Sequence, residues 1–370
     1  MKICVPKEIC QNETRVALVP QSVKKITQKG LEVLIESTAG EASFFTDKDY
    51  EECGGKIVRD TKSLYSSSDL IIKIRKPENS EIDLIKEGSV LVSLLHPATN
   101  IDTVKKLTSK KISAFSLDSV PRITRAQSMD VLSSMATVAG YKAVLIAANT
   151  MPKFFPMLMT AAGTVAPAKV FIIGAGVAGL QAIATARRLG AVVEAFDTRP
   201  IVKEQTESLG ARFVELDLGG EQTEGSGGYA KEVSKELHKR ELELIGKHVK
   251  KSDVVITTAQ IPGKKAPILI TENMVKEMQI GSVIIDLASE QGGNCEVTEV
   301  GKQTVKHGVT VCGFLNLPAL MPYHASQMFS KNMESVINHL VKDKQINLDL
   351  NDEINKGALL THHNNLAGVH

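Results

Sequence analysis

A glycine-rich turn between two apolar runs gives this sequence its clearest chemical signal. Residues 170–179 read Val-Phe-Ile-Ile-Gly-Ala-Gly-Val-Ala-Gly, and a second apolar run ends at residues 194–197, Glu-Ala-Phe-Asp. In the spacing G-x-G-x-x-G, Gly174 permits a tight turn, Gly176 lets the backbone approach a pyrophosphate, and Gly179 lets a helix pack on a strand. We therefore predict a strand–helix–strand unit whose helix N-terminus faces the phosphates of a dinucleotide.

An acidic residue closes the second apolar run. Asp197 stands 18 residues after Gly179, close to the spacing at which a carboxylate binds the ribose hydroxyls of NAD. Because a carboxylate repels a 2′-phosphate, Asp197 favours NAD over NADP. Arg199 is ambiguous, since it could soften this discrimination or simply be a solvated or helix-capping residue. The predicted cofactor-binding residues are Gly174, Ala175, Gly176, Val177, Ala178, Gly179, Asp197, Thr198, Arg199 and Gln260. The alternative is a Rossmann-like core that binds another ligand.

A second polar group lies in residues 122–133, which read Arg-Ile-Thr-Arg-Ala-Gln-Ser-Met-Asp-Val-Leu-Ser. Here a guanidinium, an amide, a carboxylate and a hydroxyl stand at a loop-to-helix boundary between two expected domains. Such groups could hold a nicotinamide carboxamide and ribose in a cleft. The alternative is an N-terminal helix cap with surface charges.

Composition limits the possible functions. A chain of 370 residues exceeds one ordinary core, so we expect two domains. A net charge of +2 and the absence of Trp give no case for nucleic-acid binding. The five cysteines form no C-x-x-C pair, and with no signal peptide we expect reduced, cytosolic thiols.

The most apolar region, residues 138–186, contains lysines and prolines at several positions. We therefore expect no uninterrupted apolar span of membrane length and no direct insertion into a membrane.

The elements that must position these residues alternate between strand and helix. In the first 120 residues we expect strands at 1–5, 31–35, 70–74, 89–95 and 112–116, with helices at 20–29, 47–53 and 101–109. A long helix at 128–148 would lead into the second domain, and residues 151–162 would form packed irregular or helical core. Later strands are expected at 212–215, 253–257, 282–286 and 309–312, and helices at 231–250, 271–278 and 326–340.

This alternation predicts an α/β fold with two Rossmann-like, doubly wound parallel-sheet domains and an interdomain cleft. The first domain would be discontinuous, comprising residues 1–134 plus 321–370, and the NAD-binding domain would be 135–320. Residues 218–229 are glycine-rich and acidic and end in Tyr229. We expect this segment to be a mobile lid or a surface insertion.

The motifs together resemble the alanine dehydrogenase/transhydrogenase alpha family, and within it the NAD(H)-binding alpha-1 subunits of proton-translocating NAD(P) transhydrogenase. The resemblance covers essentially the whole chain. It rests on Lys7-Glu8, the run 13–20, residues 122–140, the glycine fingerprint, and the runs 196–200, 227–229, 257–263 and 286–294.

The resemblance implies five catalytic residues. Arg122 and Ser133 would hold the nicotinamide carboxamide, and Asp130 would orient that network. Gln127 would reach toward the ribose of a partner nucleotide, and Tyr229 would belong to a mobile loop that closes over bound nucleotide. No metal site is expected.

The implied activity is a Re/Si-specific transhydrogenation, in which hydride passes directly from NADH to NADP⁺ bound on a partner subunit. This reaction requires positioned rings and excluded water rather than an acid or base at the reacting carbons. Separate membrane-spanning subunits would couple it to proton translocation. The resemblance also implies a homodimer that is cytoplasmic and peripherally associated with the inner membrane.

Alanine dehydrogenase is the main alternative within the same family. Arg15 and His96 match its substrate-binding positions, but Arg75 stands where that enzyme has a lysine and Glu290 where it has an aspartate. An arginine stays protonated and cannot take over a proton-transfer role. His96 could equally be a structural residue at a strand end. A nucleotide-binding regulator without catalysis is a third possibility.

Overall fold

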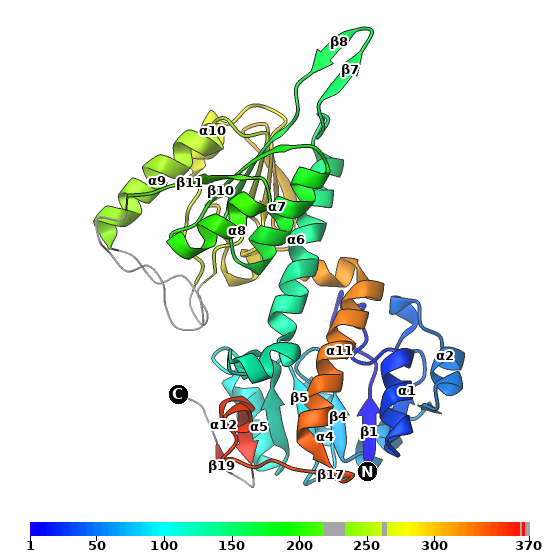
Figure 1. Ribbon diagram of the computed structural model, residues 1–370. Helices are drawn as coiled ribbons and strands as arrows, with labels where there is room; N and C mark the ends of the chain where they lie inside the picture. Colours follow the sequence, from blue (N-terminus) through cyan, green and yellow to red (C-terminus); the bar gives the residue numbers. More distant parts are fainter. Residues whose placement is uncertain (218–233, 261–264, 363–364, 367–370) are drawn as a thin grey trace. The chain divides into compact units, whose positions relative to one another are not determined.

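The chain folds into two units. The computed structural model describes residues 1–217, 234–260, 265–362 and 365–366. Unit 1 comprises Met1–Met135 and Pro318–His370, and unit 2 comprises Ala136–Leu317. Each is an α/β unit around its own sheet, as the sequence predicts (Figure 1).

Unit 1 is built on a sheet in the order β19-β18-β6-β5-β4-β1-β2-β3. The six strands β1 to β6 are mutually parallel, whereas β18 is antiparallel to β6 and β19 to β18. The strands are β1 (Lys2–Val5), β2 (Glu32–Glu36), β3 (Lys56–Val58), β4 (Leu70–Ile72), β5 (Val90–Ser93), β6 (Ser113–Ser116), β18 (Leu359–His362) and β19 (Asn365–Leu366). The helices are α1 (Pro20–Gln28), α2 (Asp47–Glu52), α3 (Thr61–Ser67), α4 (Asn79–Leu84), α5 (Ile101–Ser109), α11 (Pro322–Leu340) and α12 (Glu353–Ala358).

The central strands β4, β5 and β6 are buried at every residue. Their short apolar runs fit a parallel sheet that is covered on both faces. The sequence pattern located them but did not indicate β18, which returns from the far end of the chain to pair with β6.

Helix α11 is joined to the start of the chain by buried serines. Ser326 and Ser330 accept hydrogen bonds from the backbone N–H groups of Val16 and Val19, each at 3.0 Å. These donors lie in the segment that enters α1, where backbone groups need partners outside the helix.

Unit 2 contains a seven-stranded sheet in the order β11-β10-β9-β12-β13-β15-β14. Its strands are β9 (Lys169–Ile173), β10 (Val192–Phe196), β11 (Arg212–Val214), β12 (Val254–Thr257), β13 (Val283–Asp286), β14 (Gln303–Lys306) and β15 (Val309–Cys312). The helices that belong wholly to it are α7 (Val177–Arg188), α8 (Lys203–Ser208), α9 (Lys235–Val249) and α10 (Glu272–Glu277). All neighbouring pairs are parallel except the edge pair β14–β15.

The chain moves from β9 to β10 and β11 on one side of the sheet, and β12 then pairs on the other side of β9. The carboxyl end of β9 is therefore a topological switch point, where open α/β sheets bind ligands. Side chains of β9 alternate between two cores, with Val170 and Ile172 in one and Phe171 and Ile173 in the other.

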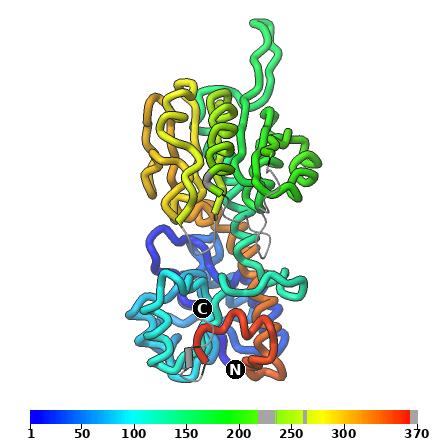
Figure 2. Tube along the Cα trace, turned by 90° about the vertical axis from the view of Figure 1, so that its left-hand side faces the viewer, coloured from blue at the N-terminus to red at the C-terminus, as the bar shows by residue number. Residues whose placement is uncertain are grey.

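Residues 151–162 match the expectation only in part. Met151 and Phe155 are buried in the core of unit 2. The rest of the segment leads into a hairpin of β7 (Leu158–Thr160) and β8 (Gly163–Val165), which form a separate two-stranded sheet. Figures 1 and 2 both show this hairpin projecting from the larger sheet of unit 2. Met157 is 56% exposed and Met159 is 78% exposed. The methionines suggested a core because hydrophobicity alone does not say what covers a side chain.

The long helix α6 (Val131–Thr150) also corrects the sequence interpretation. It is long and apolar enough to cross a membrane by length and composition, with a mean hydropathy of 1.5. Of the lysines and prolines in residues 138–186, Lys142 lies inside α6, and the others come after the helix ends. Core helices pass the same test, and Ala143, Val144 and Ala147 of α6 are buried in the core of unit 2.

Candidate nucleotide site

The glycine turn follows β9 at the switch point. Gly174 adopts a φ of +98°, which glycine tolerates far better than other residues. Helix α7 begins at Val177 with Gly176 as its N-cap residue. A Cβ on Gly179 would overlap the carbonyl oxygen of Gly174, whereas a Cβ on Gly176 would meet nothing closer than 3.9 Å. Gly174 and Gly179 are thus required by the fold, and Gly176 leaves open space beside the turn.

The other predicted residues of the turn lie at or near the start of α7. Ala175 is buried, and its backbone N–H donates to Asp197 Oδ2 at 2.7 Å. Val177 is exposed at the first helical position. The carbonyl of Ala178 is approached so closely by Gly140 of α6 that a Cβ on Gly140 would overlap it. The N–H groups of the first helical turn can thus bind an anion, because they have no partners within the helix.

Asp197 follows β10 and is held by groups of the chain itself. It is only 8% exposed. Besides Ala175, Arg199 provides three donors to its carboxylate: the backbone N–H at 2.9 Å, Nε at 2.8 Å and Nη2 at 2.6 Å. The structure thus gives Arg199 a specific partner, and no sequence pattern indicated this bidentate pair. Thr198 lies half-buried between the two.

Sequence reasoning missed the residues that support the turn from β12. Thr258 follows this strand and donates from Oγ1 to the Gly174 carbonyl at 3.0 Å. Buried Asn294 accepts from the Ala259 N–H at 3.1 Å and donates to the carbonyls of Ala259 and Pro267 at 2.9 and 2.8 Å. Their position directly after parallel strands or in the loops beyond them is the signal that could have identified them.

The predicted residue Gln260 stands in the same loop. It is exposed, and its Nε2 donates to the Leu287 carbonyl at 2.9 Å. The structure therefore brings Gly174–Gly179 and Asp197–Arg199 together, with the Thr258 segment bonded directly to the turn.

In unit 1, the loop of residues 122–133 contains a 3₁₀ turn, Thr124–Met129, followed by α6. Asp130 accepts from the Ser133 backbone N–H at 2.9 Å and from its hydroxyl at 2.6 Å. This is an N-terminal helix cap, so the cap interpretation describes these two residues. Arg122 and Gln127 lie exposed on the same loop. The remaining predicted catalytic residue, Tyr229, lies outside the described residues.

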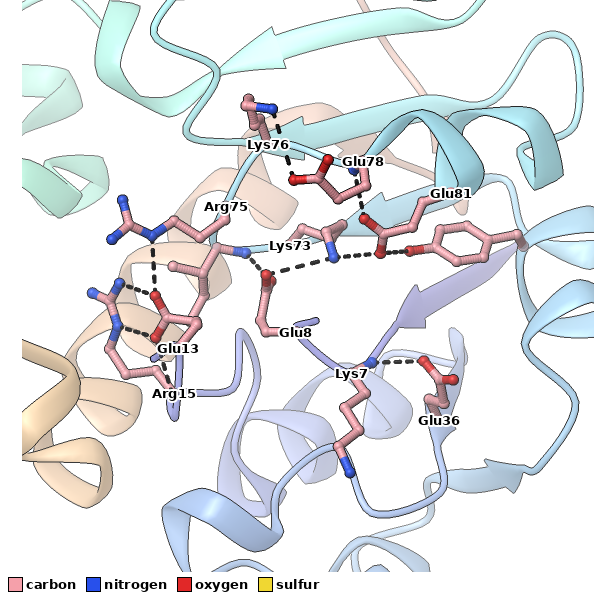
Figure 3. Close-up of polar contacts among 12 residues, drawn as sticks. Lys7, Glu8, Glu13, Arg15, Glu36, Lys73, Arg75, Lys76, Glu78 and Glu81 are labelled. Carbon is pink, nitrogen blue, oxygen red and sulfur yellow. Dashed lines mark hydrogen bonds and ion pairs between the residues drawn. The ribbon is translucent and has the colours of Figure 1, made fainter. Parts of the chain in front are cut away.

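A charged cluster stands after β1 and β4 of unit 1 (Figure 3). Glu13 accepts hydrogen bonds of 2.7 and 2.6 Å from the Arg15 guanidinium and one of 3.1 Å from the Arg15 backbone N–H. Arg75 Nε donates to the same carboxylate at 3.2 Å. Burial alone would raise the pKa of Glu13, but the two guanidinium groups outweigh it and lower the pKa to about 2. Both arginines at the alanine dehydrogenase-like positions thus share one carboxylate of the chain.

Buried Lys73 lies beside this cluster. Its Nζ lies 2.7 Å from Glu81 Oε1 and 3.5 Å from Glu8 Oε2. Tyr65 donates to the same Glu81 oxygen at 2.7 Å, and Glu8 Oε1 accepts the Ile74 N–H at 2.6 Å. Burial raises the pKa of Glu8 despite the opposing charge of Lys73. The network ties the end of β4 to β1 and α4.

His96 and Glu290, the other positions compared with alanine dehydrogenase, lie in different units. His96 has a φ of 47°, its backbone N–H donates to Asp118, and its Nδ1 lies 3.6 Å from Asp118 Oδ2. Glu290 belongs to unit 2 and accepts the Asn316 N–H at 3.0 Å. Within the described ranges, no group of three or more His, Cys, Asp or Glu residues could hold a metal ion.

The sheet order, the glycine turn at its switch point and the acid after β10 define a dinucleotide-binding α/β protein of two Rossmann-like units. Comparison with known families then identifies the group. The family described as alanine dehydrogenase/PNT, N-terminal domain, matches residues 4–139, and its C-terminal domain matches residues 143–368. The chain belongs to the alanine dehydrogenase/PNT family.

This chain is more similar to the relatives named transhydrogenase than to those named alanine dehydrogenase. The chain is 47% identical to the first part of NAD(P) transhydrogenase subunit alpha from Rhodospirillum rubrum, covering 98% of this chain and 96% of the relative. A crystal structure of transhydrogenase from Sinorhizobium meliloti matches with a TM-score of 0.87 and 40% identity, covering 100% and 99%. An L-alanine dehydrogenase structure gives 0.83 and 26%, covering 100% and 97%.

Proposed function

We propose that this chain is the NAD(H)-binding alpha subunit of a proton-translocating NAD(P) transhydrogenase. It would pass hydride from NADH to NADP⁺ that is bound on a partner subunit. The observation that carries the proposal is the glycine turn and Asp197 at the switch point, in a chain that is similar to transhydrogenase alpha subunits over nearly its full length. Residues 135–320 would form the NAD-binding domain, and residues 1–134 plus 321–370 the other.

Each predicted residue has a task in this reaction. The N–H groups at the start of α7 would bind the pyrophosphate, and Asp197 the adenosine ribose. Arg122, Ser133 and Asp130 would hold and orient the carboxamide, while Gln127 would reach toward the partner nucleotide and Tyr229 would belong to a closing loop. The bound nicotinamide supplies the hydride, and the protein contributes placement and the exclusion of water.

Two charged positions argue against amino-acid oxidation. Arg75 replaces the lysine that could exchange a proton, and Glu13 binds both Arg75 and Arg15. A keto-acid substrate would have to compete with this carboxylate for both guanidinium groups. Alanine dehydrogenase activity is the second candidate because the family includes it.

A homodimer is also proposed, together with peripheral attachment to the inner membrane through membrane-spanning partner subunits. The hairpin β7–β8 supports the dimer. Phe154, Met157, Met159 and Val165 are exposed on it and on the segment that leads to it. Exposed apolar side chains on a hairpin that forms a two-stranded sheet of its own are typical of a protein interface.

The test uses the purified chain with NADH. We expect it to bind NADH, to leave pyruvate and ammonia unreduced, and to transfer hydride to NADP⁺ only after an NADP-binding transhydrogenase subunit is added. Rapid reductive amination of pyruvate by the chain alone would establish the alanine dehydrogenase alternative. NADH binding without transfer in the presence of the competent partner would indicate a regulator.

A further inference from the structure

The carboxylate of Asp197 has no capacity left for a ribose. A carboxylate offers about four lone-pair sites. Four N–H donors of the chain already point at Asp197: one from Ala175 and three from Arg199. The two hydroxyls of an adenosine ribose would bring further donors to the same oxygens. They can bind only if some of the present donors leave, and the guanidinium is the group that can leave by side-chain rotation, without a change of the backbone.

The same guanidinium also lies near the turn that faces the phosphates. If Gly176 carried a Cβ, Nη2 of Arg199 would be its nearest neighbour, at 3.9 Å. Arg199 is only partly exposed and forms a 2.6 Å ion pair with Asp197. Its side chain therefore lies close both to the ribose-binding acid and to the glycine at which a pyrophosphate would approach the backbone.

We propose that Arg199 is an internal competitor for Asp197, which weakens NAD(H) binding and makes the site tolerant of a 2′-phosphate. This rests on the proposed function, because it assigns Asp197 to the ribose. When nucleotide binds, the guanidinium leaves the carboxylate and stays close enough to pair with a phosphate. Arg199 thus sets both the affinity for NAD(H) and the discrimination against NADP(H).

The surrounding charges explain why the effect should differ between the two nucleotides. The Asp197 carboxylate is negatively charged, and the guanidinium of Arg199 is its ion-pair partner at 2.6 Å. Without Arg199, a 2′-phosphate would meet the Asp197 carboxylate without that guanidinium. The same loss would free Asp197 to accept the hydroxyls of NADH.

The experiment compares Arg199→Gln, Arg199→Lys and the parent chain in titrations with NADH and NADPH, followed by nucleotide fluorescence. For Arg199→Gln we expect the Kd for NADH to fall about three- to tenfold and the Kd for NADPH to rise by a similar factor. Lysine keeps the charge but not the bidentate fork, so Arg199→Lys should lie between the other two. Arg212→Gln is the matched control, because Arg212 is a surface arginine of the same unit that pairs with Glu194.

The opposite changes are the decisive readout, since damage to the fold would weaken both nucleotides together. Weaker NADH binding by Arg199→Gln would overturn the proposal and would assign Arg199 to the phosphates instead. Unchanged affinities for both nucleotides would overturn it as well. Failure of the parent chain to bind NADH at all would contradict the proposed function, and that result is distinguishable from either outcome.

Discussion

Glu13 forms ion pairs with two arginines of unit 1, Arg15 and Arg75. It is buried and serves two guanidinium groups, one of them on Arg15, which is only 3% exposed. Removing one partner of a buried ion pair leaves the other charge without compensation. Glu13 therefore compensates the charges of both arginines from within the chain itself.

We expect Glu13→Gln to lower the free energy of unfolding by about 3 kcal/mol at neutral pH. The pKa of Glu13 is lowered to about 2 in the folded chain from its ordinary value of 4.5. The difference in the free energy of unfolding between the parent chain and the variant is therefore complete above pH 4.5. It declines as the pH falls through 4.5 toward 2. Denaturant unfolding over that range measures it, with Glu52→Gln in the exposed Lys48 pair as the control. A difference that does not depend on pH would contradict the assignment.

A further prediction concerns the role of Gln127 in hydride transfer. Its side chain is exposed, and its backbone carbonyl accepts the Asp130 N–H at 3.3 Å in the local turn. Gln127→Asn should therefore keep the loop and the Kd for NADH but slow hydride transfer by about tenfold or more, because small displacements of reacting groups are costly. Stopped-flow transfer with the NADP-binding partner measures this, with Gln21→Asn as control. Loss of NADH affinity without slower transfer would exclude the assigned role.

In the turn between β9 and α7, Gly176 and Gly179 have different roles. A Cβ on Gly179 would overlap backbone, so Gly179→Ala should destabilise the protein by about 2–3 kcal/mol and abolish NADH binding. Gly176 has an ordinary extended backbone and open space, so Gly176→Ala should unfold like the parent chain. It should nevertheless bind NADH more weakly, because its methyl group would stand where the pyrophosphate approaches.

Thermal unfolding and NADH titration of both variants test this contrast. If Gly176→Ala bound NADH like the parent chain, the phosphates would have to bind elsewhere. If Gly179→Ala folded and bound normally, the close packing of α7 on the turn would not be required.

The elements also show how far the sequence could predict this fold. Short apolar runs and the glycine spacing located the parallel strands and the turn, because those signals depend on adjacent residues. Local periodicity does not encode contacts between distant segments or the orientation of side chains. It therefore did not indicate the pairing of β18 with β6, the bond from Thr258 to Gly174 or the bidentate Arg199–Asp197 pair. The hairpin was misassigned because its methionines resemble core residues.

The hairpin provides a prediction for the whole molecule. If it forms the interface of a homodimer, Met159→Asp should place a charge in an apolar contact and weaken self-association at least about tenfold. Sedimentation velocity over a concentration series measures this, and Leu350→Asp, at an exposed position of unit 1, serves as control. A parent chain that stays monomeric at micromolar concentration would exclude the dimer. Equal dimerisation of both variants would place the interface elsewhere.

The discontinuity of unit 1 has a consequence for biosynthesis. Unit 2 is one continuous stretch, but unit 1 requires Pro318–His370 to supply α11 and β18. During translation, the first 135 residues must wait for about half of the chain's synthesis time with the edge of β6 uncovered and the backbone donors of Val16 and Val19 lacking their serine partners. We therefore expect the nascent chain to need chaperone protection most while unit 2 is emerging from the ribosome, although unit 1 is synthesised first.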